Sequence, residues 1–221
     1  MLNVSNKIFK GITAGAHRLW CHKCYKSTLP LRVILMIFNT IAFQDCVIKW
    51  ARDHRVHHKF SDTDADPHNS TRGLFFSHVG WLLVKKHRLV HEAGKKIDIS
   101  DLYDDPVLQF QKKYYGILMP LLCFILPTVI PVVFWQESWI YAWFVPACFR
   151  YVLTLHITWS LNSFAHKFGT KPYDDRITPT QNVFVAALAL GEGWHNFHHV
   201  ILDNIYGSKF SMSFSVIPMG L

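Results

Sequence analysis

The stretch from Tyr115 to Trp135 is 21 residues long and contains no charged side chain. A helix needs about 20 apolar residues to cross the hydrocarbon core of a bilayer, so this stretch is long enough to span a membrane. A second stretch, Trp139 to Leu161, follows after three residues, and Arg150 is its only formal charge. Prolines interrupt both stretches, but membrane-spanning helices tolerate proline. The sequence therefore predicts a hairpin of two transmembrane helices, residues 115–135 and 139–161.

The charged residues predict how this hairpin is oriented. The chain is 50% hydrophobic, only 17% charged, and carries a net charge of +8, which fits an anionic membrane face or an acidic ligand and gives no reason to expect a nucleic acid partner. Basic residues flank the hairpin on both sides: Lys112, Lys113, Lys167, Lys171 and Arg176. The connector between the spans has no basic residue, so the positive-inside rule places both flanks in the cytosol. We expect residues 44–114 and 162–221 to be cytosolic.

The rest of the chain predicts helices that do not span the bilayer. Residues 29–43 and 73–84 are apolar but short, and we expect interfacial helices there. Residues 183–190 are shorter still and predict a buried helix. The five cysteines are odd in number, which argues against a disulfide framework, and residues 1–11 show no secretory signal. The expected fold class is an all-α integral membrane protein in which the hairpin carries a cytosolic helical cap.

Eight of the 14 histidines fall into three short boxes: His17 and His22; His54, His57 and His58; and His195, His198 and His199. In the second and third boxes the spacing is i, i+3, i+4, so on a helix all three rings project from one face. The first pair is five residues apart, about 140° on an α-helix, so we expect it to straddle a helix end or to serve two metals. Asn162 and His166 form a further candidate pair, spaced i, i+4.

These nine histidines and one amide predict a metal centre. Closed zinc sites commonly include thiolates, whereas a set of imidazoles without an obvious carboxylate ligand suits two borderline metals, and iron is the natural candidate for oxygen chemistry. We expect the five remaining histidines to be structural or interfacial: His68, His78, His87, His91 and His156. Cys21 and Cys24 have CxxC spacing, but no second pair completes a zinc site.

The three boxes, in this order and separated by a membrane hairpin, closely resemble the membrane-bound acyl-CoA desaturases, the stearoyl-CoA Δ9-desaturase family. The resemblance covers residues 12 to 200. The matching segments are TAGAHRLW from Thr13, WARDHRVHHKF from Trp50, DADPH from Asp64, SHVGWLL from Ser77, NSFAH from Asn162 and GEGWHNFHH from Gly191.

The resemblance implies an oxidoreductase of fatty acid biosynthesis that lies in the endoplasmic reticulum membrane as a multi-pass protein, with its histidine boxes facing the cytosol. Such an enzyme uses O2, two Fe2+ ions and electrons from cytochrome b5 and its reductase. It inserts a cis double bond into a saturated fatty acyl-CoA such as stearoyl-CoA or palmitoyl-CoA. On this basis the helical cap is expected to hold a histidine-rich di-iron centre, with no catalytic residue beyond the metal ligands.

The resemblance also implies roles for individual residues. One iron would be held by His17, His54, His58 and His198, with His22 near it or near its neighbour, and the other by His57, His166, His195 and His199, with Asn162 bound directly or through water. The implied substrate contacts are Asp45, Arg52, Asp53, Lys85, Lys86 and Trp159. Of these, the basic residues match contacts to CoA, Trp159 matches a position in the acyl tunnel, and Asp53 is also a candidate for orienting a metal ligand.

The chain departs from this family in three places. The family has two membrane spans before the first box, whereas 16 residues precede His17 here, and the segment after His199, ending in residues 214–221, reads differently. Asp45 and Cys46 stand where vertebrate members have an Asn-Asp pair. We therefore expect residues 1–221 to form an incomplete desaturase domain, truncated at the N-terminus and atypical at the C-terminus. Alternatives are Δ11 or another regioselectivity, a di-iron fatty acyl hydroxylase, or an inactive truncated form that associates with a full-length desaturase.

Overall fold

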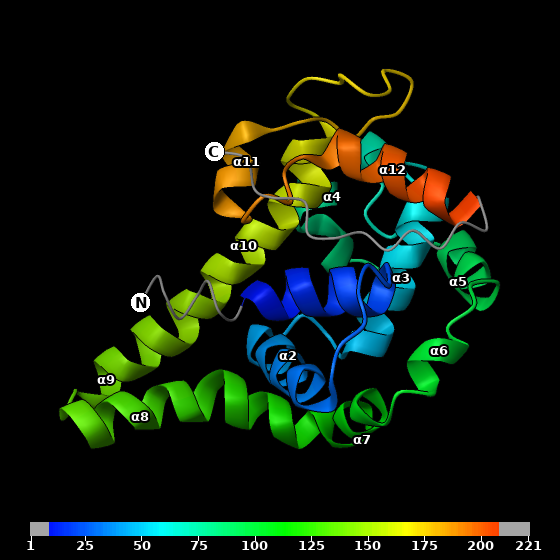
Figure 1. The fold of residues 1–221 in the computed structure, drawn as a ribbon. Coiled ribbons are helices and arrows are strands. Elements are labelled where there is room, and N and C mark those ends of the chain that lie inside the picture. The colour runs from blue at the N-terminus through cyan, green and yellow to red at the C-terminus, as the bar shows by residue number, and fades with distance from the viewer. Residues whose placement is uncertain (1–8, 208–221) are drawn as a thin grey trace. The chain divides into compact units, whose positions relative to one another are not determined.

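The structure is a computed structural model that describes residues 9–207, with side chains up to residue 201 (Figure 1). Within these residues every regular element is a helix, and the only β-type pairings are the isolated bridges Thr170–Gln181 and Gln181–Trp194. The expected all-α fold class is confirmed. Residues 1–8 and the atypical segment 214–221 lie outside the described residues.

The elements follow one another along the chain without strands between them. In order they are η1 (Gly11–Cys21), α2 (Leu29–Ala42), α3 (Val47–Lys59), η2 (Ser70–Arg72), α4 (Leu74–His78), η3 (Gly80–Leu82), α5 (Arg88–Lys95), α6 (Ser100–Tyr103), α7 (Pro106–Pro120), η4 (Leu121–Ile125), α8 (Leu126–Trp135), α9 (Trp139–Ala142), η5 (Trp143–Phe149), α10 (Arg150–Ser163), η6 (Phe164–His166), α11 (Val183–Leu188) and α12 (His195–Gly207). Within the described residues they form two compact units: residues 9–52 with 98–155, and residues 53–97 with 156–207.

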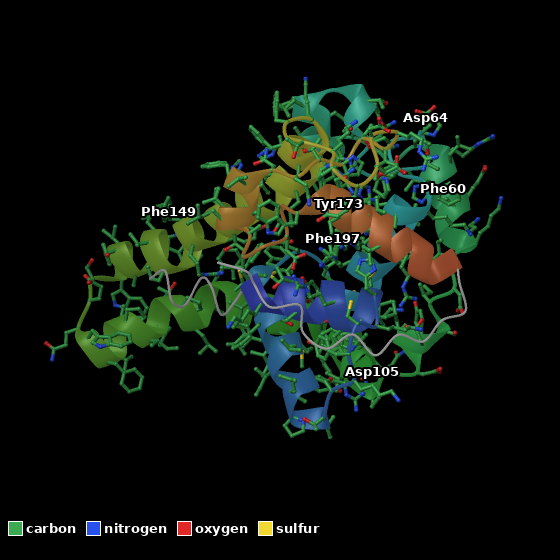
Figure 2. All side chains as sticks on the ribbon, turned by 45° about the horizontal axis from the view of Figure 1, so that its top comes forward. Phe60, Asp64, Asp105, Phe149, Tyr173 and Phe197 are labelled. Carbon is green, nitrogen blue, oxygen red and sulfur yellow. The ribbon has the colours of Figure 1, made fainter. Side chains whose placement is uncertain are left out.

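Two continuous helical runs are long and apolar enough to cross a membrane. A short turn between α8, the end of the first run, and α9, the start of the second, joins them (Figure 1). The first, Pro106–Trp135, comprises α7, η4 and α8, and the second, Trp139–His166, comprises α9, η5, α10 and η6. Large apolar side chains along both runs are exposed, including Phe134, Ile140 and Phe149. Of these, Figure 2 labels Phe149. Such exposure suits helices that face lipid rather than water, and the protein is an integral membrane protein.

Local chemistry sets where these runs begin and how they bend. Asp105 caps α7, since its Oδ1 accepts from the N–H of Val107 at 2.9 Å, and Pro106 at the first helical position has no N–H to satisfy. Pro120 and Pro146 lie at or within the π-helical segments η4 and η5. A proline removes a backbone donor, and a wider turn lets the neighbouring carbonyls find other partners.

The first unit builds its core around α2. α2 packs on η1 and α7; Leu35 and Met36 are buried, while Leu31 and Ile34 are exposed. The chain then bends by 80° into α3, and together the two helices have the length and composition of one broken span. Whether residues 29–43 lie at the membrane interface stays a prediction.

The second unit forms helices where two short apolar runs predicted them. Residues 73–84 form two short helices, α4 and η3, rather than one, because the chain breaks at Val79 (φ −136°). In residues 183–190 the helix α11 buries Val185 and Ala186 but exposes Val183 and Phe184. The expected helix is present there, and it is buried on one face only.

Candidate metal centre

The second and third histidine boxes both lie on helices, which is what their spacing requires. His54, His57 and His58 occupy the last two turns of α3, and α12 begins at His195. Because residues three and four apart share a helix face, each box presents its rings in one direction. His166 comes from the end of the second apolar run, in η6.

Four of these histidines form a buried group, which we call the inner group: His57, His166, His195 and His199. One ring nitrogen from each lies within 4.8 Å of the others, and all four residues are buried. His195 Nε2 lies 3.1 Å from His166 Nε2 and 3.2 Å from His199 Nε2. The residues are the four that the resemblance implied for one iron.

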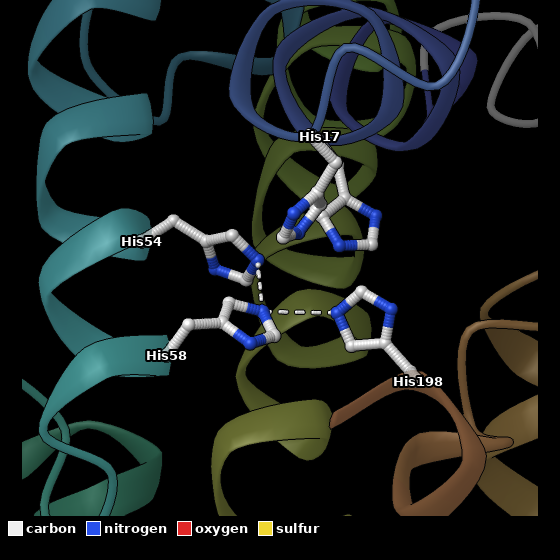
Figure 3. Close-up of side chains that lie close together, drawn as sticks. His17, His54, His58 and His198 are labelled. Atoms are coloured by element: carbon white, nitrogen blue, oxygen red, sulfur yellow. Dashed lines mark hydrogen bonds between the residues drawn. The ribbon is translucent and has the colours of Figure 1, made fainter. Parts of the chain in front are cut away.

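Three more histidines of the same unit form an outer group: His54, His58 and His198 (Figure 3). His58 Nε2 lies at the centre, 3.1 Å from His54 Nε2 and 3.0 Å from His198 Nε2. These side chains are partly buried rather than fully buried. Two helices, α3 and α12, thus each supply histidines to both groups.

Ring geometry shows that the nitrogens of these pairs do not point directly at each other. In the pair His78–His156 the nitrogens are 2.9 Å apart and the ring centroids 5.2 Å apart, as expected when two nitrogens point at each other in a hydrogen bond. In His54–His58 the nitrogens are farther apart, at 3.1 Å, yet the centroids are closer, at 4.6 Å. The same holds for His195–His199, at 3.2 and 4.6 Å. Rings can be closer only if their nitrogens point past each other.

Two carboxylates fix which nitrogen faces the inner group. His166 Nδ1 lies 2.9 Å from the Asp62 carboxylate, and His57 Nδ1 lies 2.9 Å from both oxygens of Asp66. An ionised carboxylate only accepts, so each Nδ1 carries the proton and donates it, which leaves the lone pair on Nε2. Carboxylates behind metal-binding imidazoles act in this way, holding the ring and its tautomer.

The charge state of both carboxylates fits this role. Burial alone would raise the pKa of Asp62, but hydrogen bonds from His166 and Thr178 keep it well below its ordinary value. Burial likewise favours a raised pKa for Asp66, and the neighbouring His57 reverses this and lowers it. The Asp62 carboxylate also accepts a hydrogen bond from the backbone N–H of Ser70, and the Asp66 carboxylate accepts from the backbone N–H groups of Asp62 and His68. These bonds hold the loop that carries both carboxylates in one conformation.

The residues fit a divalent transition metal. Two nitrogens bound to one ion at about 2.1 Å and about 90° to each other lie roughly 3 Å apart, and the observed separations are 3.0 to 3.2 Å. A set of neutral imidazoles suits borderline metals such as iron better than Mg2+ or Ca2+, which prefer oxygen. The geometry therefore supports a metal centre without identifying the ion.

The first box behaves differently from its α-helical prediction. The pair straddles a helix end as expected, since η1 ends at Cys21 and His22 follows it. However, η1 is a π-helix, and the N–H of His22 donates to the carbonyl of His17 at 2.9 Å, an i to i+5 bond. The rings therefore meet, with centroids 4.6 Å apart, and the expected separation of about 140° is wrong. Metal binding by this pair stays a prediction.

Asn196, inside the third box, anchors a loop to α12. Its side chain is fully buried and uses all its bonding capacity: Oδ1 accepts from the N–H groups of Tyr173 and Asp174, and Nδ2 donates to the carbonyls of Asp174 and Pro179. Tyr173 also packs on Phe197, with ring centroids 5.1 Å apart (Figure 2). The start of α12, and with it the third box, is thus tied to residues 173–179.

The remaining candidate residues are placed less specifically. Asn162 is partly buried on α10, one turn before His166, and the ring of Trp159 lies beside those of His78 and His156. Lys86 forms an ion pair with Asp53, and Lys85 is exposed. In the other unit Asp45 pairs with Lys49 at 2.7 Å, and Arg52 is partly buried on α3. Their contacts with substrate stay predictions.

Sequence reasoning missed the two carboxylates that bond the inner-group rings, Asp62 and Asp66. It proposed Asp53, which pairs with Lys86, and a role of Asp53 in orienting a ligand stays a prediction. The available signal was the acidic run that follows the second box, with Asp62, Asp64 and Asp66 in five residues. His68, assigned no metal role, lies beside Asp66, and burial lowers its pKa to about 3, which keeps it neutral.

Comparison with known proteins agrees with the histidine pattern. The model of the fatty acid desaturase family matches residues 5–201. The acyl-CoA Delta-9 desaturase of Acheta domesticus is 64% identical over 190 residues, 86% of this chain and 53% of that protein. The Delta(9)-fatty-acid desaturase fat-6 of Caenorhabditis elegans is 60% identical over 205 residues, 93% of this chain and 60% of that protein. The acyl-CoA Delta(11) desaturase of Trichoplusia ni is 62% identical over 190 residues, 86% of this chain and 54% of that protein. The chain thus spans between half and two thirds of these relatives.

Proposed function

Because the chain belongs to the fatty acid desaturase family, we propose that it forms part of an oxidoreductase that introduces a cis double bond, of the Δ9 type, into a saturated fatty acyl-CoA. The observation that carries the proposal is the convergence of seven histidines in two groups, two of them backed by carboxylates. The Δ9 position is supported by the names of the cricket and nematode relatives.

The metal in this proposal is a pair of Fe2+ ions. The inner group would hold one, with Asn162 directly or through water, and the outer group would hold the other with His17 and, near it or its neighbour, His22. When bound, iron supplies the capacity to activate O2 for removing hydrogen from an unactivated methylene. The chain's own contribution is positional: Asp62 and Asp66 orient His166 and His57, and burial of the inner group excludes water.

The substrate contacts in this proposal follow from charge. Arg52, Lys85 and Lys86 would bind the phosphates of CoA, for which guanidinium and ammonium groups are suited. Asp53, which pairs with Lys86, and Asp45 would contact polar parts of the substrate, and Trp159 would line the path of the acyl chain. Stearoyl-CoA and palmitoyl-CoA are the proposed substrates.

The proposed setting is the endoplasmic reticulum membrane, with both flanks of the hairpin and all histidine boxes in the cytosol. The basic residues on both flanks, such as Lys113 and Lys171, support this orientation. Cytochrome b5 and its reductase would supply electrons from the same side.

Product analysis in desaturase-deficient yeast tests the proposal. The chain is expressed alone and joined to the N-terminal part of the Acheta relative, and a His199→Ala variant of each serves as control. We expect a monounsaturated acid whose double bond, located by mass spectrometry, lies at Δ9 and disappears in the control. A bond at Δ11 would favour the regioselectivity named for the Trichoplusia relative. Hydroxy acid without monoene in the active form would contradict desaturation, and no product from either form would favour an inactive partner of a full-length enzyme.

A further inference from the structure

The outward face of α11 is apolar and uncovered. Val183 and Phe184 are 69% and 70% exposed and Leu188 is 42% exposed, while Val185 and Ala186 of the same helix are buried. A surface helix whose outer face meets water would carry polar residues on that face. Here the apolar stripe is on both faces, so burial of the inner face alone does not explain the composition of the helix.

Two phenylalanines extend this face toward the second membrane span. Phe164 and Phe168 are both exposed, and their ring centroids are 5.8 Å apart. Asn182 connects them to α11: its Nδ2 donates to the carbonyl of Phe168 at 2.8 Å, and its Oδ1 caps α11 by accepting from Val185 at 2.9 Å. We call Phe164, Phe168, Val183, Phe184 and Leu188 the α11 surface.

The α11 surface begins inside a membrane-spanning run. Phe164 belongs to the run Trp139–His166, so one residue of the exposed surface lies at the end of a helix that is long and apolar enough to span a membrane. Contiguous exposed apolar patches on a folded protein mark an interaction site. The position of Phe164 at the end of such a helix indicates that the partner here is the same bilayer, at the depth where the helix leaves it.

The two segments that carry this surface contain lysines but no acidic residue. Residues 177–191 contain no charged side chain, and the charged residues of segment 164–171 are both lysines, Lys167 and Lys171. Lys167 Nζ lies 5.7 Å from the centre of the Phe168 ring. A lysine beside an aromatic ring can keep its stem in the apolar region and its ammonium at the headgroups.

From these observations we propose that the α11 surface lies in the bilayer interface, with its five apolar side chains among lipid acyl chains and Lys167 and Lys171 at anionic headgroups. This goes beyond the proposed function and holds whether or not the chain is an active desaturase. It gives the second unit a membrane contact of its own, in addition to the hairpin. The same helix packs on Gly193, two residues before the third histidine box, so the anchor is adjacent to the metal centre.

Site-specific photocrosslinking tests the proposal on the full chain in vesicles of phosphatidylcholine with phosphatidylserine. The probe is the photoreactive amino acid p-benzoylphenylalanine, placed at Phe184. Phe134, exposed in the hairpin, is the lipid-facing reference, and Arg176, exposed in a polar loop, is the aqueous reference. We expect lipid adducts at position 184 in a yield comparable with position 134 and several-fold above position 176, detected by mass spectrometry.

A peptide adduct at position 184, or a lipid yield no higher than at position 176, would overturn the proposal. The first result would show that protein covers the surface, and the second that water does. A second arm replaces both lysines, Lys167→Gln with Lys171→Gln. The lipid yield at position 184 should fall several-fold toward the value in pure phosphatidylcholine, and an unchanged yield would refute the headgroup contact.

Discussion

His166 donates from Nδ1 to the Asp62 carboxylate across 2.9 Å, and this bond turns the lone pair of His166 Nε2 toward the other histidines of the inner group. The two residues are 104 positions apart in the chain. Asp66 has the same relation to His57, and it also accepts from the N–H of Asp62, so the two carboxylates form one hydrogen-bonded loop. The orientation of two candidate ligands thus depends on the loop that carries Asp62 and Asp66.

Replacing Asp62 with asparagine should weaken metal binding. The amide still fits the space, but it has lost the negative charge that fixes the proton on His166 Nδ1. Loss of such a partner typically lowers metal affinity by about 10- to 100-fold. We expect Asp62→Asn to lower the Fe2+ retained per chain during titration with a chelator. The matched control is Asp64→Asn, an exposed carboxylate on the same loop. Equal retention in both variants would show that Asp62 does not orient a ligand.

Replacing a histidine of the pair His78–His156 should not change the metal content of the protein. Its centroid separation of 5.2 Å indicates nitrogens that point at each other, and His78 Nδ1 lies 2.9 Å from the hydroxyl oxygen of Ser163. His78 therefore has a hydrogen-bond partner at each ring nitrogen. We expect His156→Ala to keep the iron content of the unaltered chain, whereas His199→Ala lowers it. Iron per chain after purification is the measurement, and a loss in His156→Ala as large as in His199→Ala would invalidate the ring-geometry criterion.

The features that sequence could predict are those set by local spacing. The i, i+3, i+4 boxes predicted shared helix faces at His54–His58 and His195–His199, and the two long apolar runs predicted helices long enough to span a membrane. The π-helical form of η1 was missed because the prediction assumed 3.6 residues per turn. The pairing of Asp62 with His166 was missed because it depends on how distant segments pack, which periodicity does not encode.

Gly193 should not tolerate even a methyl group. A Cβ there would lie within 2.6 Å of the Cα of Ala186 and of the carbonyl oxygen of Asn182, so α11 or the start of α12 would have to shift. Overpacking of this kind typically costs about 1–3 kcal/mol. We expect Gly193→Ala to lower the thermal unfolding midpoint in detergent and to reduce iron content. In Gly116→Ala, the control, the Cβ meets nothing within 4 Å, so helix propensity predicts no loss. Equal unfolding midpoints for Gly193→Ala and Gly116→Ala would contradict tight packing at Gly193.

Arg150 should stabilise the hairpin through backbone carbonyls of three elements. Its guanidinium is buried and donates to the carbonyl of Pro146 in η5 at 2.8 Å, of Cys123 in η4 at 2.7 Å and of Ile41 in α2 at 3.2 Å. Carbonyls near π-helical turns and helix ends lack intrahelical partners, and the planar fork of arginine reaches several at once. A lysine has its three N–H donors on a single nitrogen, so it cannot reproduce the spread of Nε, Nη1 and Nη2 that reaches the three carbonyls.

We therefore expect Arg150→Lys to lower the thermal midpoint, since each hydrogen bond to a charged group contributes about 1.5–3 kcal/mol. Arg176→Lys, at an exposed arginine, should leave the midpoint unchanged. Cys123 provides a local readout, because its Sγ is 3.4 Å from the Arg150 guanidinium and is buried. Maleimide should label Cys123 faster in Arg150→Lys than in Arg176→Lys, since the helices around it separate more readily. If neither the midpoint nor the labelling rate changes, Arg150 does not hold these helices together.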